Sequence, residues 1–333
     1  MTDTGRPAES PPVGSVRGRI GTVLIWVLVS PAALGAAVRL SGSERGRLVQ
    51  VLAFTPYLAA WSVVPVLIAL AARHRAALVV AVTAAALLGV AVLPRALPAR
   101  GPAGGVALPV MTANLWFGNA DPATIVELVH DHRVAVLGLQ EFTPQARDAL
   151  AAAGLGALLP YSSLAPEPGP SGSAVYSRFP ITGPGARRND GGFLQAYGTI
   201  QPPGAGPVTI ESVHPLAPTV PRTFPVWRAD LAAQPPPDPA GTPRILVGDF
   251  NATLDHPSLR RLIARGYRDA ADASGTGLAG TWGPYDGDPI PPVALDHVLV
   301  DQRIGVRDLA VRPLAGTDHR ALLAWLAVPP GSP

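Results

Sequence analysis

Polar side chains that can bind a cation or move a proton stand at the ends of short apolar runs in this chain. RILVGDFN (residues 244–251) shows the pattern clearly, because Asp249 and Asn251 follow a run typical of a buried strand. Residues two apart in a strand share a side, so we expect Asp249 and Asn251 to face one way and Phe250 to face the core. A carboxylate beside a carboxamide suits a hard cation, or a water and a phosphate oxygen. Taken alone, the same residues are equally typical of a turn.

The pattern recurs at five other places, which argues against a chance origin for the set as a whole. Three apolar runs end in polar residues and two begin with an Asp-His pair; the residues are Asn114, Glu141, His214, Asp296 with His297, and Asp318 with His319. Together they predict one polar site at the rim of packed sheets.

The elements that must position these residues lie between residues 106 and 329, which we interpret as one domain. Helices are expected at residues 121–133, opened by Asp121, and at residues 143–154, ended by Gly154. Short strands separated by turns make up most of the remainder. Many short strands with a few helices predict an α/β sandwich.

The order of these motifs resembles the endonuclease/exonuclease/phosphatase superfamily, which includes deoxyribonucleases, abasic-site endonucleases, inositol polyphosphate phosphatases and bacterial sphingomyelinases. Asn114, the QE that ends in Glu141, SRFPI, a strand-end His214, GDFN, LDHVLV and the final DH follow one another as in that family. The resemblance covers residues 108–328. It implies a four-layer α/β sandwich, in which two packed, mostly antiparallel sheets are flanked by helices.

The resemblance also implies roles for individual residues. Glu141 resembles the principal Mg²⁺ ligand of the family, with Asn114 and Asp318 as further or water-mediated ligands. The catalytic set comprises a carboxylate for the attacking water, an amide that holds water and phosphate, a phosphate-binding histidine with its carboxylate partner, and a second histidine; these are Asp249, Asn251, His319, Asp296 and His214. The implied cofactor is Mg²⁺, with Mn²⁺ as a substitute.

Several other residues have simpler interpretations. His297 follows Asp296 in a strand and should point to the opposite face, which favours a structural role. His256 is expected at the start of a helix. For Trp282, packing is favoured over a platform beside the site.

Three long apolar runs without charges precede the domain. They span residues 20–38, 48–72 and 76–94, and each approaches the roughly 20 residues that a helix needs to cross a bilayer. We therefore expect a polar tail (1–19), three transmembrane helices within residues 20–97, and a linker (98–105). A soluble helical bundle or a signal peptide is the alternative, although a signal peptide is not followed by two more such runs.

Membrane orientation is not decided by charge. Five arginines would lie on each side of a three-span topology, so the positive-inside rule is balanced. Arginines 17 and 19 adjoin the first span and favour a cytoplasmic N-terminus, which places the C-terminal domain outside the cytoplasm.

Composition restricts the function further. Residues 101–333 carry 16 arginines against 20 acidic residues, unlike a strongly basic nucleic-acid-binding domain. The chain has no cysteine, which excludes disulfides and thiolate metal sites. The sequence predicts a membrane-anchored, Mg²⁺-dependent phosphoesterase whose partners are the bilayer and a phosphoester substrate. An extracytoplasmic nuclease, or a non-catalytic tethered protein that binds phosphorylated ligands, remains an alternative, and the sequence leaves the oligomeric state open.

Overall fold

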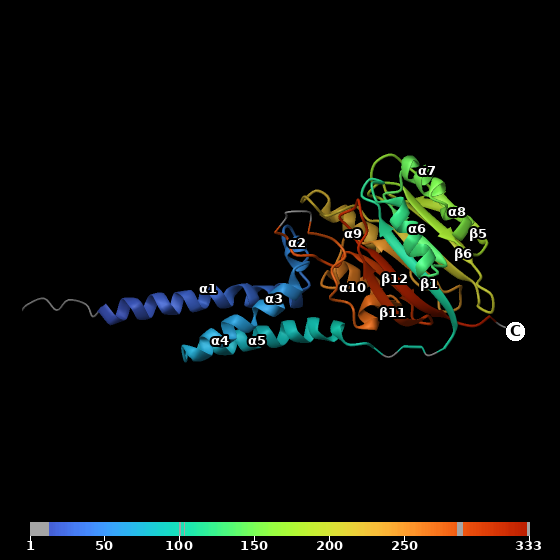
Figure 1. Ribbon diagram of the computed structural model, residues 1–333. Helices are drawn as coiled ribbons and strands as arrows, with labels where there is room; N and C mark the ends of the chain where they lie inside the picture. Colours follow the sequence, from blue (N-terminus) through green and yellow to red (C-terminus); the bar gives the residue numbers. More distant parts are fainter. Residues whose placement is uncertain (1–12, 100, 103, 285–288, 332–333) are drawn as a thin grey trace, which may run out of the picture. The chain divides into compact units, whose positions relative to one another are not determined.

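The structure is a computed structural model that describes residues 13–99, 101–102, 104–284 and 289–331. The chain divides into two compact units (Figure 1). The first unit contains the chain through Ser41 together with Thr55–Ala91, and the second contains Gly42–Phe54 and the chain from Val92 onward. Most of the predicted polar tail, together with Arg100 and Ala103 of the predicted linker, lies outside the described residues.

The first unit is a bundle of apolar helices. It contains α1 (Val13–Ser41), α3 (Thr55–Trp61), α4 (Val63–Ala71) and nearly all of α5 (Arg75–Val92). Small side chains such as Ala32 and Ala69 are fully buried, whereas large ones such as Val23 and Leu67 are exposed. Small residues inside and large apolar residues outside are typical of helices that pack within lipid.

The prediction of three full-length spans is wrong for the described residues. Two helical stretches, Gly18–Ser41 and Arg75–Ala96, are long and apolar enough to cross a bilayer, and the apolar stretch Thr55–Ala71 is shorter. The predicted span 48–72 is divided because α2 (Leu48–Leu52) belongs to the second unit, where Val49 is buried in its core.

The interruption between α3 and α4 also has a local cause. Ser62 separates the two helices, three residues before Pro65. Proline has no backbone N–H, so Pro65 cannot donate to the carbonyl of Trp61, and its ring disfavours a regular helix there.

The second unit is built on two six-stranded sheets. The first sheet has the order β11-β12-β1-β2-β4-β3 and the second the order β5-β6-β7-β8-β10-β9. The strands of the first sheet are β1 (Val106–Asn114), β2 (Val136–Gln140), β3 (Tyr161–Ala165), β4 (Ser173–Ser177), β11 (Gly305–Arg312) and β12 (Ala321–Val328). Those of the second are β5 (Ile181–Arg188), β6 (Leu194–Ile200), β7 (Val208–Val213), β8 (Arg244–Asp249), β9 (Tyr267–Asp269) and β10 (Asp296–Asp301).

Each sheet contains one parallel pair among antiparallel neighbours. Strand β1 lies parallel to β2 in the first sheet, and β7 lies parallel to β8 in the second. Parallel strands end at the same edge of a sheet, so the residues that end each pair are brought together there. The two mixed sheets with flanking helices form an α/β sandwich, as the sequence predicts.

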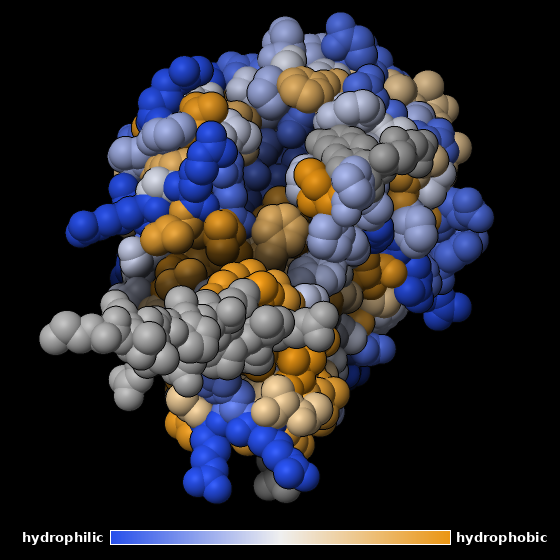
Figure 2. All heavy atoms as spheres, turned by 90° about the vertical axis from the view of Figure 1, so that its left-hand side faces the viewer, coloured by the Kyte–Doolittle hydropathy of each residue, from blue (hydrophilic) through white to orange (hydrophobic). Residues whose placement is uncertain are grey.

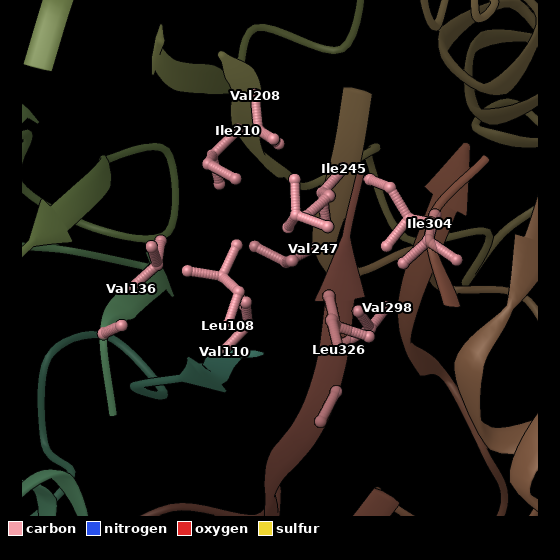
Figure 3. Packing of buried hydrophobic residues seen from close by; sticks show 14 of the residues in the cluster. Leu108, Val110, Val136, Val208, Ile210, Ile245, Val247, Val298, Ile304 and Leu326 are labelled. Carbon is pink, nitrogen blue, oxygen red and sulfur yellow. The ribbon is translucent and has the colours of Figure 1, made fainter. Parts of the chain in front are cut away.

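The main core lies between the two sheets. Leu108 and Val110 of β1 face Ile210, Val247 and other aliphatic side chains in a continuous cluster, in which the labelled side chains point toward one another (Figure 3). Gly138 of β2 allows the sheets to approach closely, because a Cβ atom there would lie 2.4 Å from Cγ2 of Val247.

Helices cover the outer faces of both sheets (Figure 1). Apolar residues of α6–α8 pack on the first sheet, and those of α9 and α10 pack on the second. The bounds are α6 (Pro122–Asp131), α7 (Pro144–Ala152), α8 (Leu155–Leu158), α9 (Phe224–Ala232), α10 (Pro257–Ala264), α11 (Ala270–Ser274) and the 3₁₀ helix η1 (Leu93–Ala96).

The predicted start of α6 is confirmed. Asp121 is its N-cap, and the carboxylate accepts a hydrogen bond from the backbone N–H of Thr124 at 2.9 Å. Helix α9 was not expected, because proline-rich stretches precede and follow it. Its fully buried Trp227 and Leu231 show that tertiary packing stabilises this helix.

Gly138→Ala should destabilise the domain, because the added methyl group overlaps Val247 between the sheets. Overpacking of a core costs roughly 1–3 kcal/mol, which a lower Tm in thermal unfolding would reveal. Gly156→Ala is the matched control, since no atom lies within 4 Å of its Cβ position. Equal Tm values for both variants would contradict the close approach of the sheets.

Candidate active site

The predicted site residues come together at one edge of the sandwich. Asn114 ends β1, Glu141 follows β2, His214 follows β7 and Asp249 ends β8, so both parallel pairs deliver polar residues there. Asp296 opens β10 directly opposite Asp249. The hydrogen bonds and ion pairs described below join these residues into one cluster.

The Asp249 carboxylate lies at the centre of the cluster. Its Oδ2 accepts a hydrogen bond from Nδ2 of Asn114 at 3.1 Å, and the Nε2 atoms of His214 and His319 each lie 3.7 Å from the same oxygen. Its Oδ1 accepts from the backbone N–H of Asn251 at 2.7 Å. Burial is the main reason why the pKa of Asp249 is raised, although the nearby His319 acts in the opposite direction.

His319 is held as a cation by carboxylates. Its Nδ1 lies 2.9 Å from Oδ2 of Asp296, which agrees with the predicted pairing. Burial alone would lower the pKa of His319, but Asp296 and then Asp249 outweigh it and raise the pKa to about 10. The imidazole therefore carries a positive charge at neutral pH, with Nε2 directed toward Asp249.

His214 has the opposite electrostatic character. Burial, followed by the positive charge of His319, lowers its pKa to about 3. Its ring meets Phe193 edge-on, with ring centroids 4.7 Å apart. The site thus holds one cationic and one neutral histidine near the same carboxylate oxygen.

Asn251 lies in the cluster, but its side chain is occupied. Its Nδ2 donates to the carbonyl of Pro215 at 3.1 Å, and its φ of 48° shows that the strand geometry ends at Asp249. The expectation that Asp249 and Asn251 share one face of a strand is therefore replaced by a turn closed through Asp249 Oδ1. Phe250 is fully buried, as expected.

Glu141 is held by strained backbone. Glu141, Trp116 and Phe117 have φ values of 56°, 45° and 57°, which are unusual for residues with large side chains. The strain is offset by hydrogen bonds, because Phe117 N–H donates to Glu141 Oε2 at 2.7 Å and Trp116 N–H donates to Asn114 Oδ1 at 3.0 Å. This arrangement leaves both aromatic side chains exposed beside the site.

Trp282 contacts a predicted site residue, although the sequence interpretation favours packing for it. Its Nε1–H donates to Oδ2 of Asp318 at 2.7 Å, and its backbone pairs with His319 across an isolated bridge. The expected packing role is therefore incomplete, since the indole orients a predicted ligand. The nearby GTDH motif was the available signal, but nothing in the sequence pairs it with GTWG.

Gly248 allows strand β8 to lie close to strand β7 directly before Asp249. Its φ of 142° is one that side-chain-bearing residues rarely adopt, and a Cβ atom would lie 2.1 Å from the carbonyl oxygen of Val213. The space beside Gly248 is thus occupied by the backbone of the neighbouring strand β7.

The comparisons with known proteins agree with this geometry. A model of the endonuclease/exonuclease/phosphatase family matches residues 111–319, which include every predicted site residue. The chain belongs to this family. Family members are typically hydrolases that act on phosphoester bonds and are generally dependent on a divalent metal. No curated protein matches the chain.

Solved structures of the same fold include an endonuclease/exonuclease/phosphatase from Beutenbergia cavernae, which is 18% identical with a TM-score of 0.50 over 67% of this chain and 72% of that chain. TDP2 from Caenorhabditis elegans is 15% identical with a TM-score of 0.52, over 67% of this chain and 98% of that chain. A humanized TDP2 from D. rerio is 12% identical with a TM-score of 0.55, over 67% of this chain and 99% of that chain. At these identities the likeness concerns the fold alone.

The carboxylates of the site suit a divalent cation whose remaining ligands are water and phosphate. Glu141, Asp249, Asp296 and Asp318 provide four carboxylates, against which His319 is the cationic partner in the cluster. This excess of negative charge suits a cation. Among the described residues, no three His, Asp or Glu side chains form a ready metal cage. Mg²⁺ usually takes one or two carboxylates together with water and phosphate, so a complete protein cage is not required.

The predicted ligands differ in how readily they could bind a metal ion. Glu141 is partly exposed, and burial raises its pKa despite the hydrogen bonds that it accepts. Asn114 donates its amide to both Glu141 and Asp249 at 3.2 and 3.1 Å, while its oxygen accepts from Trp116. Here Asn114 joins the two carboxylates, and its role as a ligand stays a prediction.

A cavity of about 610 Å³ opens from this cluster. Glu141, Asp249 and His319 line one part, and the rest is mostly apolar, with Trp116 and Phe117 among its lining residues. In Figure 2, the upper part of the view shows a hollow with hydrophilic residues in its depth and hydrophobic residues beside it.

The predicted structural role of His297 is confirmed. Its Nδ1 lies 2.7 Å from Oδ2 of Asp269, and its Nε2 lies 2.7 Å from the carbonyl oxygen of Ala252, away from Asp249. Burial alone lowers its pKa, but the Asp269 carboxylate and the hydrogen bonds outweigh burial, so the pKa of His297 is raised.

His297→Gln should lower the Tm, and more so in acid. A raised folded-state pKa contributes stability that is fully present below the unfolded value of about 6.5 and is lost as pH rises through the folded pKa. Thermal unfolding from pH 5.5 to 9 should therefore show a Tm deficit that shrinks with increasing pH. The exposed His130→Gln is the control. A deficit that grows toward alkaline pH would mean that folded His297 is neutral.

Proposed function

We propose that this protein is a membrane-anchored, Mg²⁺-dependent phosphoesterase that hydrolyses a phosphodiester or phosphomonoester by attack of water. The observation that carries the proposal is the convergence of Asn114, His214 and His319 on one buried oxygen of Asp249. A phosphoester is anionic, so its hydrolysis needs positive charge near the phosphate, a positioned water and support for the departing oxygen.

Asp249 is the group that orients the attacking water and accepts its proton. A general base works best when its pKa is near the working pH, and burial raises the pKa of Asp249 in that direction. The Asn251 N–H and the Asn114 amide hold the two carboxylate oxygens in place. The base is therefore oriented before substrate binds.

His319 provides positive charge for the phosphate. The Asp296 carboxylate accepts from Nδ1 and leaves Nε2–H free to donate to a phosphate oxygen. His214, neutral and on the same side of Asp249, is placed to support the leaving oxygen through its Nε2. Asn251 stays the predicted amide for water and phosphate through its side-chain oxygen and backbone.

Glu141 and Asp318 would hold the metal ion, with Asn114 bridging Glu141 to Asp249 and Trp282 orienting Asp318. When bound, Mg²⁺, or Mn²⁺ in its place, supplies positive charge that shields the phosphate oxygens. Glu141 is accessible for this role because it is partly exposed and lines the cavity.

The apolar bundle supports membrane anchoring. Gly42–Phe54 and the chain from Val92 belong to the same unit, so both must lie on one side of any membrane. If α5 crosses, the chain must therefore also cross between Phe54 and Arg75. The stretch Thr55–Ala71, at 1.5 Å per residue about 25 Å long, can do so with local thinning of the bilayer. This arrangement places the N-terminus on the opposite side from the catalytic domain, which we propose to be extracytoplasmic.

His319→Ala and Glu141→Gln should separate phosphate stabilisation from metal binding. His319→Ala should lower kcat by roughly 10²–10⁴-fold, as losses of acid–base or charge-stabilising groups do, while Mg²⁺ binding measured by calorimetry persists. Glu141→Gln should weaken Mg²⁺ binding itself, and excess chelator should abolish turnover in the unaltered protein. The exposed His130→Ala is the control.

The substrates for this experiment should cover the competing functions: soluble aryl phosphodiesters and monoesters, phospholipids, inositol phosphates and plasmid DNA. Rapid hydrolysis of DNA alone would favour the nuclease. Binding of Mg²⁺ and phosphoester without turnover of any substrate would favour the non-catalytic binding protein. Hydrolysis that persists in chelator would remove the metal from the proposal.

Membrane orientation can be tested with single cysteines, since the natural chain has none. Ala152→Cys on the domain and Ala72→Cys between α4 and α5 are both exposed. A membrane-impermeant maleimide should label Ala152→Cys in intact cells and Ala72→Cys only after permeabilisation. The reverse pattern would place the domain in the cytoplasm, and equal labelling of both in intact cells would contradict a crossing between them.

A further inference from the structure

The segment Gly42–Phe54 is a part of the catalytic unit that the family match does not include. It precedes the matched residues 111–319 by more than fifty positions, yet it packs on the second sheet's outer layer. Val49 of α2 is 1% exposed and lies in one apolar cluster with Trp227 and Phe250. Phe250 adjoins the catalytic Asp249, so the segment contacts the site's immediate support.

Polar contacts fix the segment in place. The buried Glu44 carboxylate accepts hydrogen bonds from the backbone N–H and the hydroxyl of Ser258, and it lies 3.5 Å from Nη2 of Arg261. His256 accepts from the Thr253 N–H through Nδ1, so its Nε2–H donates to the carbonyl of Val49 at 2.7 Å. Burial lowers the pKa of His256, which agrees with this neutral form.

A second anchor lies where the chain leaves the apolar helices. Arg95 of η1 is buried and makes a two-pronged ion pair with Asp255, with N–O distances of 2.7 and 2.6 Å. Residues 255–261 thus hold both the chain before Thr55 and the chain after α5. These buried ion pairs and hydrogen bonds give Gly42–Phe54 a defined position in the unit, which a flexible linker would not have.

The anchored segment forms a wall of the catalytic cavity. Val49, Gln50, Ala53 and Phe54 line the same cavity as Asp249 and His319. The apolar surface continues from this wall to other parts of the domain, including Phe117, Leu216 and Ile290. None of the described residues that line the cavity is an arginine, although arginine is the only basic residue type besides histidine in the chain.

We propose that Gly42–Phe54 forms a subsite that receives the apolar group of an amphiphilic phosphoester while its phosphate lies at Asp249 and His319. This inference rests on the proposed phosphoesterase function and adds a wall, and a substrate class, that the family match does not supply. Burial of an alkyl chain contributes about 0.8 kcal/mol for each CH₂ group removed from water. The apolar cavity therefore selects substrates by the group attached to the phosphate.

The charge of the cavity distinguishes this substrate from nucleic acid. A nucleic acid strand needs several cationic side chains along its phosphates, and binding depends on them. The cavity offers His319 beside the catalytic carboxylates and apolar surface elsewhere. In addition, Gly42–Phe54 continues directly into the apolar helix α3 at Thr55. A substrate that resides in lipid therefore suits a subsite formed by this segment.

The test compares p-nitrophenyl methyl phosphate with p-nitrophenyl octyl phosphate, using the full chain in detergent micelles with Mg²⁺. The two esters share a leaving group and differ in the apolar group. The unaltered protein should prefer the octyl ester in kcat/KM by about tenfold or more, since several CH₂ groups are buried. Phe54→Ala and Ala53→Asp should each reduce this octyl-to-methyl ratio by about tenfold.

Val51→Asp is the matched control, because Val51 lies in the adjoining helix α2 of the same segment, is 43% exposed and does not line the cavity. It should retain the ratio. Glu44→Ala should lower the ratio and also increase hydrogen exchange in residues 42–54, which would connect the loss to release of the wall. Thermal melting of each variant identifies those that fold.

Failure of the subsite and failure of the enzyme give different results. Hydrolysis of both esters with equal kcat/KM, or a ratio that Ala53→Asp and Phe54→Ala leave unchanged, would overturn the subsite and leave the phosphoesterase intact. If neither ester nor any substrate of the wider panel is hydrolysed, the enzyme proposal fails, and binding of octylphosphonate against methylphosphonate by calorimetry decides the subsite. Equal binding of the two phosphonates, or cleavage of plasmid DNA in preference to the octyl ester, would also overturn it.

Discussion

Desolvation of the Asp249 carboxylate is the constraint on which the rest of the site depends. A buried carboxylate is costly unless donors and cations surround it, and the structure meets this cost with Asn114, the Asn251 N–H and His319. The His319 charge needs a partner of its own, which Asp296 provides. Asp249, His319 and Asp296 therefore stabilise one another's charges inside the protein.

The two parallel strand pairs bring that cluster together. Four of the site residues follow or end strands β1, β2, β7 and β8, and the antiparallel strand β10 adds Asp296 opposite Asp249. The two sheets must pack closely for these edges to meet, and Gly138 and Gly248 are the places where a side chain would prevent it. The core between the sheets thus positions the polar residues of the site as well as stabilising the fold.

The chain before the family domain contributes in two ways. Its long apolar helices bury alanines and expose larger apolar side chains, which suits a lipid environment. Between them, Gly42–Phe54 belongs to the second unit, where the contacts of Glu44 and His256 hold it in place. The proposed subsite would add a wall from outside the matched residues 111–319 to the fold of the family.

The α/β sandwich and the set of polar strand-end residues were predictable before folding was known, because local periodicity and the order of motifs are properties of short stretches. The structural role of His297 and the Asp121 helix cap were also predictable from the sequence, since alternation along a strand and helix capping are local. Three features became clear from the folded chain: Trp282 orients Asp318, Asn251 closes a turn, and residues 48–54 of the predicted second span belong to the second unit. Each of these features depends on contacts between segments that are distant in the chain. The second span was mispredicted because an apolar run has the same composition in a transmembrane helix and in a protein core.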